Sequence, residues 1–318
     1  MNLSPWPNPL IEQRADPYIY RHYDGYYYFT ASVPEYDRLE IRRAATLTGL
    51  AQAVPAVVWR KHDRGAMSAL IWAPELHFID RKWYLYFAAA HSPDIVDGLF
   101  QHRMFVLECA DDNPLTGQWI EKGQIKTPLD TFSLDATHFY HRQRHYYLWA
   151  QKDPAIRGNS NLYLAEMATP WSLKTAPAML SKPELPWETI GFWVNEGPAV
   201  IRHGQRLFIS YSASATDENY CIGLLWADID ADITNPGVWH KLPHPVFGTH
   251  RQNRQFGPGH NSFTLGEQGE PVLVYHARSY TEIIGDPLYD PNRHTRVKAF
   301  DWDDEGMPQF GEPPADHA

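Results

Sequence analysis

The sequence predicts an all-β fold, specifically a five-bladed β-propeller that forms a single domain over residues 1–318. Five stretches fit one template, in which a short strand-like run, a polar turn and a second strand-like run follow one another. Aromatic residues make up 14% of the chain, and they favour pleated, half-buried strands. Repeats of short antiparallel strands at this length are typical of propeller blades. The stretches open 57 to 64 residues apart, at Asp16, Ala73, Asp135, Glu196 and His260.

Each repeat begins with a predicted β-hairpin. In the first, strands at 18–20 and 26–30 flank the pair Asp24-Gly25, and Asp-Gly is a strong signal for a tight hairpin turn. The later hairpins follow the same pattern. Their strands are expected at 77–79 and 83–87, at 139–140 and 146–149, and at 200–201 and 207–211, with the last second strand at 272–275.

Further apolar runs after each hairpin predict the outer strands of four-stranded blades. Third strands are expected at 39–42, 104–107, 162–164 and 222–225, and the fourth strands are marked by Trp59, Trp119, Trp171 and Trp239. No linker or low-complexity tract divides the chain, which favours one domain. A β-sandwich with long loops is the alternative architecture, but it does not require five hairpins in register.

Composition excludes several classes of protein. The net charge is −10 and no basic stripe is present, so neither nucleic acid nor a membrane surface is an expected partner. The two cysteines, Cys109 and Cys221, lie far apart and give neither a disulfide framework nor a metal-binding spacing. The N-terminal residues lack a secretory signal pattern, and no apolar run reaches the ~18 residues that span a bilayer. We therefore expect a cytoplasmic protein, although removal of a leader would leave the same sequence.

The openings of the repeats predict a functional site. In a propeller the first strand of each blade lines the central channel, so Asp16, Asp135, Glu196 and His260 are expected to meet at one mouth. Carboxylates held close together raise one another's pKa, and such clusters are a signal of function. A structural interpretation exists for single members, because Asp16 precedes Pro17 and an acidic residue there often caps a turn.

Blade order suggests different roles for the carboxylates. Blades three and four are neighbours, so the charge of Asp135 is expected to keep Glu196 protonated, as a general acid requires. Blade one is not adjacent to blade four, which leaves room for a water molecule between Asp16 and Glu196. Carboxyl groups about 6.5–9.5 Å apart fit an inverting glycosidase, whereas about 5–5.5 Å fits a retaining one. The blade order predicts inversion.

Six segments in this order resemble glycoside hydrolase family 43, whose members are five-bladed propellers acting on arabinose- and xylose-containing polysaccharides. The segments are RADPYIYRHYDGYYYFTAS, IWAPELHFIDRKWYLYFAA, SLDATHFY, VNEGPAVIRHGQRLFISYS, GPGHNSF and VYHARS, and the resemblance covers nearly the whole chain. It implies that Asp16 is the general base that activates water and Glu196 the general acid. Asp135 becomes the third carboxylate, which tunes the acid and orients the substrate.

The resemblance also implies roles for three further residues. Trp72 is expected to form an apolar wall for the sugar ring, and Arg278 to bind hydroxyls at the non-reducing end. His260 resembles a channel histidine beside an ion, often calcium, that is bound through water. Calcium prefers oxygen ligands, so a satisfied histidine is the alternative, as core packing is for Trp72 and a surface cation for Arg278. No cofactor is required for the chemistry.

Within the family, VPEYDRLEIRRA followed by IWAPELHFID looks most like the exo-acting α-L-arabinofuranosidases. The segments 91–103 and 280–294 are long enough to block one end of a cleft. The chain ends soon after FDWDDEG, without the β-sandwich typical of the β-xylosidases. We expect release of terminal arabinofuranose from arabinan or arabinoxylan oligosaccharides. The alternatives are a β-xylosidase, an endo-arabinanase, a retaining enzyme of the fructosidase type, or a propeller that binds carbohydrate without catalysis.

Overall fold

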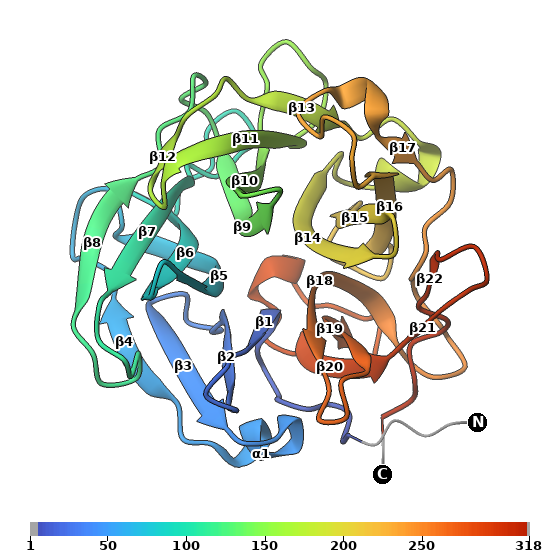
Figure 1. The fold of residues 1–318 in the computed structure, drawn as a ribbon, viewed down its shortest axis with the longest axis horizontal. Coiled ribbons are helices and arrows are strands. Elements are labelled where there is room, and N and C mark those ends of the chain that lie inside the picture. Colours follow the sequence, from blue (N-terminus) through green and yellow to red (C-terminus); the bar gives the residue numbers. More distant parts are fainter. Residues whose placement is uncertain (1–5, 317–318) are drawn as a thin grey trace.

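The computed structural model describes residues 6–316, which form a ring of five antiparallel sheets around a common axis (Figure 1). The predicted five-bladed β-propeller is therefore confirmed. The first blade consists of β1 (Ala15–Arg21), β2 (Tyr27–Ser32), β3 (Arg38–Ala44) and β4 (Ala56–Arg60). Its strands pair in chain order from the axis outward, as in a propeller blade.

The next two blades repeat this order. Blade two contains β5 (Ala69–Ile79), β6 (Lys82–Ala90), β7 (Arg103–Cys109) and β8 (Trp119–Gln124). Blade three contains β9 (Ser133–His141), β10 (Arg144–Gln151) and β11 (Asn161–Thr169), and β11 also pairs with the short strands β12 (Ser172–Leu173) and β13 (Ala178–Ser181). The predicted hairpin strands and third strands of these blades lie within these elements, except that β2 begins one residue after the predicted Tyr26, and the inner strands start earlier than expected.

Blade four consists of β14 (Asn195–His203), β15 (Arg206–Ala213), β16 (Cys221–Asp228) and β17 (His240–Lys241). Blade five has β18 (Phe256–Leu265), β19 (Pro271–Arg278) and β20 (His294–Ala299), followed by the two-stranded β21 (Asp301–Trp302) and β22 (Pro308–Gln309). Four tryptophans were expected to mark fourth strands. Trp59 and Trp119 lie in β4 and β8, whereas Trp171 and Trp239 come directly before β12 and β17.

Helical elements are short and lie between strands. They are α1 (Leu47–Gln52) and the 3-10 turns η1 (Pro186–Glu188), η2 (Pro236–Val238) and η3 (Pro287–Tyr289). The Thr46 hydroxyl accepts a hydrogen bond from the Gly49 N–H (3.0 Å), which caps α1. Within residues 6–316 no helix is long and apolar enough to cross a membrane.

The N-terminal segment completes the last blade. Ile11 pairs antiparallel with Thr295, and the Asn8 side chain donates to the Val297 carbonyl (3.1 Å) while accepting from the Val297 N–H (3.0 Å). Leu10 packs into the same apolar cluster as Val297. The first described residues therefore supply the outer edge of blade five and close the ring.

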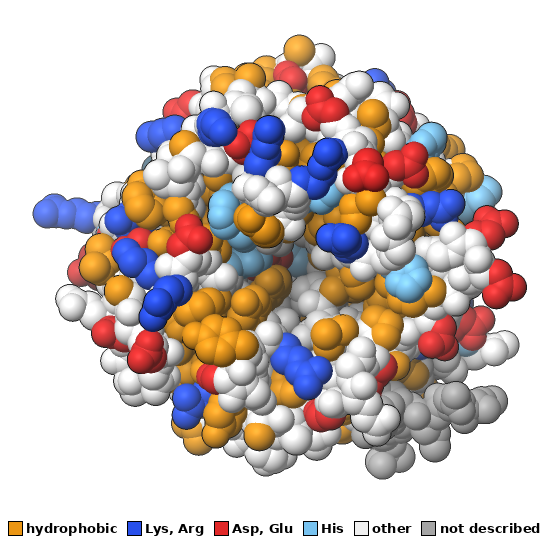
Figure 2. All heavy atoms as spheres, in the orientation of Figure 1, with side chains coloured by type: hydrophobic (Ala, Val, Ile, Leu, Met, Phe, Trp, Pro, Cys, Tyr) orange, Lys and Arg blue, Asp and Glu red, His pale blue; other side chains and the backbone are white. Residues whose placement is uncertain are grey.

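Aromatic side chains fill the space between adjacent blades. The largest side chains with almost no solvent contact include Trp83, Trp149, Tyr86 and Tyr147, all from second strands. Each such ring buries roughly 150–250 Å² on folding, so this layer dominates the apolar core. On the surface drawn in Figure 2, basic, acidic and apolar side chains are interspersed, and the face is hollowed at the centre of the ring.

Candidate active site

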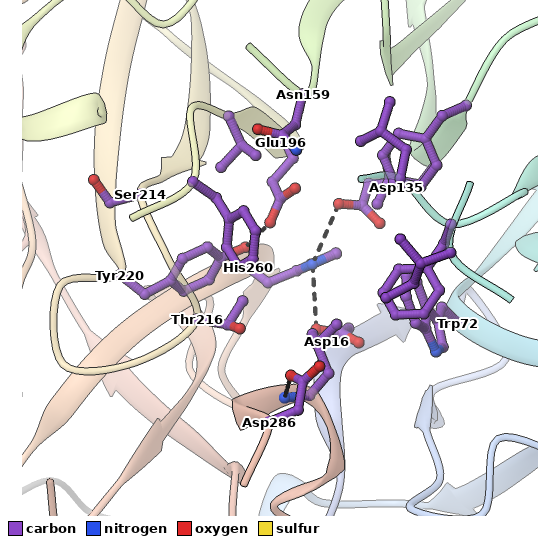
Figure 3. Close-up of a pocket in the computed structure, with 18 of the residues that line it drawn as sticks. Asp16, Trp72, Asp135, Asn159, Glu196, Ser214, Thr216, Tyr220, His260 and Asp286 are labelled. Atoms are coloured by element: carbon purple, nitrogen blue, oxygen red, sulfur yellow. Dashed lines mark hydrogen bonds and ion pairs between the residues drawn. The ribbon is translucent and has the colours of Figure 1, made fainter. Parts of the chain in front are cut away.

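A cavity of about 330 Å³ lies where the inner strands begin, a size within the range of small-molecule sites. Asp16, Asp135, Glu196, His260 and Trp72 all line it. Figure 3 shows the first four pointing toward one another across the pocket from four different blades. The structure therefore brings together five of the six residues singled out from the sequence.

A backbone bulge near the start of each inner strand aims these side chains. The ladder to the second strand shifts after Ala15, Trp72, Leu134, Glu196 and Gly259. In every blade the next residue has a left-handed backbone, namely Asp16 (φ 54°), Ala73 (46°), Asp135 (55°), Gly197 (52°) and His260 (45°). A side chain in this region costs roughly 1–2 kcal/mol, and such strain clusters at functional sites.

This geometry corrects one detail of the predicted repeat. Gly197, and not Glu196, occupies the position equivalent to Asp16 and Asp135. Glu196 stands one residue earlier, at the position of Trp72 in blade two. A Cβ on Gly197 would approach the His260 ring to 3.1 Å, so glycine suits both the backbone conformation and the limited space. Glu196 still lines the pocket, although it is the residue before the left-handed position of the bulge and not that position itself.

Asp16 is buried among donors and positive charge. Its carboxylate accepts a hydrogen bond from the Ser32 hydroxyl (2.6 Å), and the Arg293 guanidinium lies 3.5 Å away. Burial alone would raise the pKa of Asp16, but His260, Arg293 and His276, together with the Ser32 hydrogen bond, outweigh it and lower the pKa to about 2. Asp16 is therefore ionised throughout the neutral range.

Asp135 and Glu196 behave in the opposite way. Burial raises the pKa of Glu196 to about 7, and the charge of Asp16 adds to this although the Tyr220 hydroxyl, which donates to Glu196 (2.9 Å), opposes it. Burial and then the charge of Glu196 raise the pKa of Asp135 well above its usual range. The two groups titrate as a pair. Near pH 7 the pair retains a proton that Asp16 has lost.

His260 lies between the carboxylates. Its Nδ1 is 3.3 Å from Asp16 Oδ1 and 3.7 Å from Asp135 Oδ2 (Figure 3). Burial lowers the pKa of the ring, so His260 is neutral near pH 7 and donates from one nitrogen. Within residues 6–316, no group of three or more His, Cys, Asp and Glu side chains is arranged to hold a metal ion. The residues around His260 therefore do not fit direct coordination of calcium.

Trp72 forms part of the pocket wall. It is buried, stacks on His102 with 3.8 Å between ring centroids, and meets Phe100 edge-on at 5.1 Å. Its position agrees with an apolar wall for a sugar ring, and the same contacts also anchor it in the core.

Arg278 does not line the cavity, contrary to the sequence-based prediction. It is 2% exposed, and its guanidinium donates to Asp290 (3.0 Å) and to the carbonyls of Thr216 and Pro287 (2.6 Å each). These bonds occupy its three nitrogens and tie the 280–293 segment to the loop before β16. Arg278 is thus a structural tie behind the pocket wall.

Arg293 takes the place in the cavity that was expected for Arg278. Besides facing Asp16, it donates to the Tyr36 hydroxyl (2.9 Å). The sequence pointed to Arg293 only through the expectation that segment 280–294 lies at the pocket. Tyr220, the hydrogen-bond donor to Glu196, was also missed, because it follows a loop with no repeat pattern.

Comparisons with known proteins show which family the chain resembles. The family model "Glycosyl hydrolases family 43" matches residues 6–308. An extracellular exo-α-(1→5)-L-arabinofuranosidase of Streptomyces avermitilis is 55% identical over 310 residues, which cover 97% of this chain and 64% of that protein. α-L-Arabinofuranosidase 43 of Humicola insolens is 52% identical over 311 residues, with 97% and 64% covered.

Among solved structures, an α-L-arabinofuranosidase from Lactobacillus brevis superimposes with a TM-score of 0.98 at 60% sequence identity, and 98% of each chain is covered. The chain spans 64% of the length of the two curated relatives, but nearly the whole of this solved chain. The match of the family model over almost all of the described residues places this chain in glycosyl hydrolase family 43.

Proposed function

We propose that the protein is an inverting exo-α-L-arabinofuranosidase that releases terminal α-L-arabinofuranose from arabinose-containing oligosaccharides. The observation that carries the proposal is that two carboxyl groups in one pocket have very different pKa values, so that one is ionised while the other holds a proton. Asp16 has a pKa of about 2, whereas the pKa of Glu196 is about 7. A general base and a general acid working at the same pH need this difference.

The reaction follows from these protonation states. Asp16 takes a proton from a water molecule, and the water oxygen forms a bond to the anomeric carbon of the bound sugar. Glu196 gives its proton to the glycosidic oxygen as the bond to the anomeric carbon breaks. Attack from the face opposite the leaving group inverts the configuration. Asp135 holds the Gly197 N–H (3.1 Å) and raises the proton affinity of the pair, while Arg293 keeps Asp16 charged.

Two observations support a terminal arabinofuranosyl unit. Relatives above 50% identity carry the names α-L-arabinofuranosidase and exo-α-(1→5)-L-arabinofuranosidase. Segments 91–103 and 280–294 also contribute Ile95, Leu99, Asp286 and Leu288 to the cavity wall. Loops on two sides of the pocket favour binding of a chain end over binding along a polymer.

The test is hydrolysis of nitrophenyl α-L-arabinofuranoside, β-D-xyloside and β-fructofuranoside beside arabino-oligosaccharides, with proton NMR of the first product. We expect arabinose to be released first as the inverted anomer. Release of the retained anomer would contradict the roles of Asp16 and Glu196, and release of xylose alone would contradict the substrate.

We also propose that no cofactor takes part in the chemistry and that a calcium ion, if held near His260 through water, has only a structural role. Dialysis against EDTA is then expected to leave kcat unchanged. A fall in Tm that added calcium reverses would support a bound structural ion, and an unchanged Tm would contradict it.

A further inference from the structure

Glu188 is a buried acid that does not line the catalytic cavity. Its carboxylate Oε1 accepts hydrogen bonds from the Tyr211 hydroxyl (2.8 Å) and from Asn195 Nδ2 (3.0 Å). Lys241 Nζ lies 2.7 Å from Oε1 and 2.9 Å from Oε2. The side chain of Glu188 is 0% exposed, and a carboxylate buried without such partners would be very costly. Glu188 and Lys241 therefore form an ion pair whose acid is fully enclosed and hydrogen-bonded.

This ion pair joins several elements around the start of β14. Glu188 Oε2 also accepts from two backbone N–H groups just before η1 (2.8 and 2.9 Å). Tyr211 lies on β15 and Lys241 on β17, so one carboxylate connects the loop before β14 to the second and fourth strands of blade four. Lys241 Nζ also donates to the Lys182 carbonyl (2.8 Å), directly after β13, where blades three and four adjoin (Figure 1).

Asn195 is the partner of Glu188 that leads to the catalytic site, because it directly precedes Glu196. It is 0% exposed, and its Oδ1 accepts from the Ser181 hydroxyl (2.6 Å) while its Nδ2 donates to Glu188. The Asn195 N–H donates to the Ser160 carbonyl (3.1 Å), and its own carbonyl accepts from the Ser160 hydroxyl (3.3 Å). Side chain and backbone of Asn195 are therefore both held in place.

The direction of the Glu196 side chain depends on this anchor. The ladder between β14 and β15 is regular at Asn195 and Glu196 and then shifts before Ala199, so Asn195 fixes the chain where it enters the bulge. Among the described residues, Tyr220 is the one hydrogen-bond donor to the Glu196 carboxyl group. A misplacement of about 1 Å at a reacting group can cost about 10²-fold in rate. Movement of Asn195 should therefore reach the acid.

Stability alone is a weak reason for such an ion pair, because apolar residues of similar size often replace one without loss. The chain contains a comparable acid that lacks the link to the site. Glu108 is 6% exposed and accepts from the Tyr84 hydroxyl (2.7 Å) and from Lys82 Nζ (3.2 Å) in blade two. None of these three residues lines the cavity or is next in sequence to a residue that does. Glu108 therefore provides a matched control.

We propose that Glu188 is a positioning residue for the reaction: by holding Asn195, it sets the direction from which Glu196 reaches the oxygen of the leaving group. This inference rests on the proposed function. Glu188 contacts neither the sugar nor the attacking water, and Glu196 still gives the proton. Loss of Glu188 should therefore impair delivery of the proton more than attack by water.

The test compares methyl with dinitrophenyl α-L-arabinofuranoside in the variant Glu188→Gln, which keeps the shape of the side chain but removes its charge and one acceptor. We expect kcat/KM to fall by about 10–100-fold on the methyl compound. On the dinitrophenyl compound it should change by less than about threefold, because a good leaving group needs no proton. Glu108→Gln should leave the ratio of the two kcat/KM values unchanged, whatever its effect on Tm.

A second variant breaks the same link from the other side. Asn195→Ala leaves Glu188 its bonds to Tyr211 and Lys241, and it should show the same selective loss on the methyl compound. Because both changes act through one contact, the double variant should fall no more than about twofold below the weaker single variant. Cooperative thermal unfolding identifies the variants that fold, and if Glu188→Gln does not fold, Asn195→Ala decides.

The inference is wrong, while the proposed function stands, if the folded variants lose activity equally on both compounds or lose none. Glu188 would then have a structural role alone. If the unaltered protein hydrolyses neither compound nor the oligosaccharides, the proposed function itself fails, and this inference with it.

Discussion

Asp16 and Glu196 lie in one pocket, and each comes from the bulge of an inner strand, yet their surroundings differ. Asp16 faces Arg293 and accepts from Ser32, and its pKa is lowered to about 2. Glu196 is partly exposed to the cavity, has one tyrosine hydroxyl as donor, and its pKa is raised to about 7. The repeated backbone therefore places the carboxylates, whereas Arg293 and Tyr220, which lie in loops outside the repeat, help to set their different pKa values.

The largest effect should come from removing either charge. Asp16→Asn and Glu196→Gln are each expected to lower kcat by about 10²–10⁴-fold, since base and acid both act in the rate-limiting step. The two variants should differ in leaving-group dependence. Glu196→Gln should retain more activity on dinitrophenyl than on methyl arabinofuranoside, because a good leaving group needs no proton. Asp16→Asn should lose activity equally on both, which steady-state kinetics with the two substrates would measure.

Exposed Asp63→Asn is the matched control, since it makes the same chemical change away from the pocket. A cooperative thermal unfolding transition in each of the three variants would show that they fold. Equal leaving-group dependence of Asp16→Asn and Glu196→Gln would contradict the assignment of base and acid.

A smaller effect is expected from Arg293→Met, which removes the permanent cation beside Asp16. The pKa of Asp16 should rise, so the acidic limb of kcat/KM should move to higher pH, with a loss of about tenfold at pH 4 and less at pH 6. The ionised form of Asp16 also stabilises the fold by about 2 kcal/mol, fully above pH 4 and lost as the pH falls toward 2. Unfolding at pH 3 and pH 6 would therefore show a smaller pH dependence in the variant.

Arg278→Met is the control for Arg293→Met, since both residues are buried arginines near blade five and only Arg293 faces Asp16. Breaking the buried pair of Arg278 with Asp290 should destabilise the fold by about 3–5 kcal/mol but leave the acidic limb in place. If the acidic limb of kcat/KM moved equally in both variants, the conclusion that Arg293 specifically lowers the pKa of Asp16 would be wrong.

The smallest effect concerns the acid. Because Glu196 must be protonated, kcat/KM should fall as the pH rises through about 7. The Tyr220 hydroxyl favours the ionised form, so Tyr220→Phe should raise the pKa of Glu196 and move the basic limb upward by about 0.5 pH unit. A pH profile of kcat/KM from 5 to 9 measures the shift. Movement of the limb to lower pH would mean that Tyr220 instead supports the protonated acid.

The regular spacing of hairpins was sufficient to predict five blades and the convergence of three carboxylates. The same alignment misplaced Glu196 by one residue, although Gly197-Pro198 matches Asp16-Pro17 and a bulge residue with φ > 0 favours glycine. The repeat pattern could not predict which contacts the loop residues make. Arg278 and Arg293 flank one irregular segment, and only the path of that segment decides which of them turns toward Asp16.

The closing contact of blade five has a consequence for biosynthesis. Asn8 and Val297 are 289 positions apart, so the ring can close only after the ribosome has added every residue from Asn8 to Val297. Until then β19 lacks its outer neighbour and residues 8–11 lack their partner strand, and an open strand edge invites pairing with other chains. Contacts this distant in sequence also slow folding. The step most exposed to aggregation in the cell is therefore the arrival of residues 294–299 beside residues 8–11, and not the formation of any blade alone.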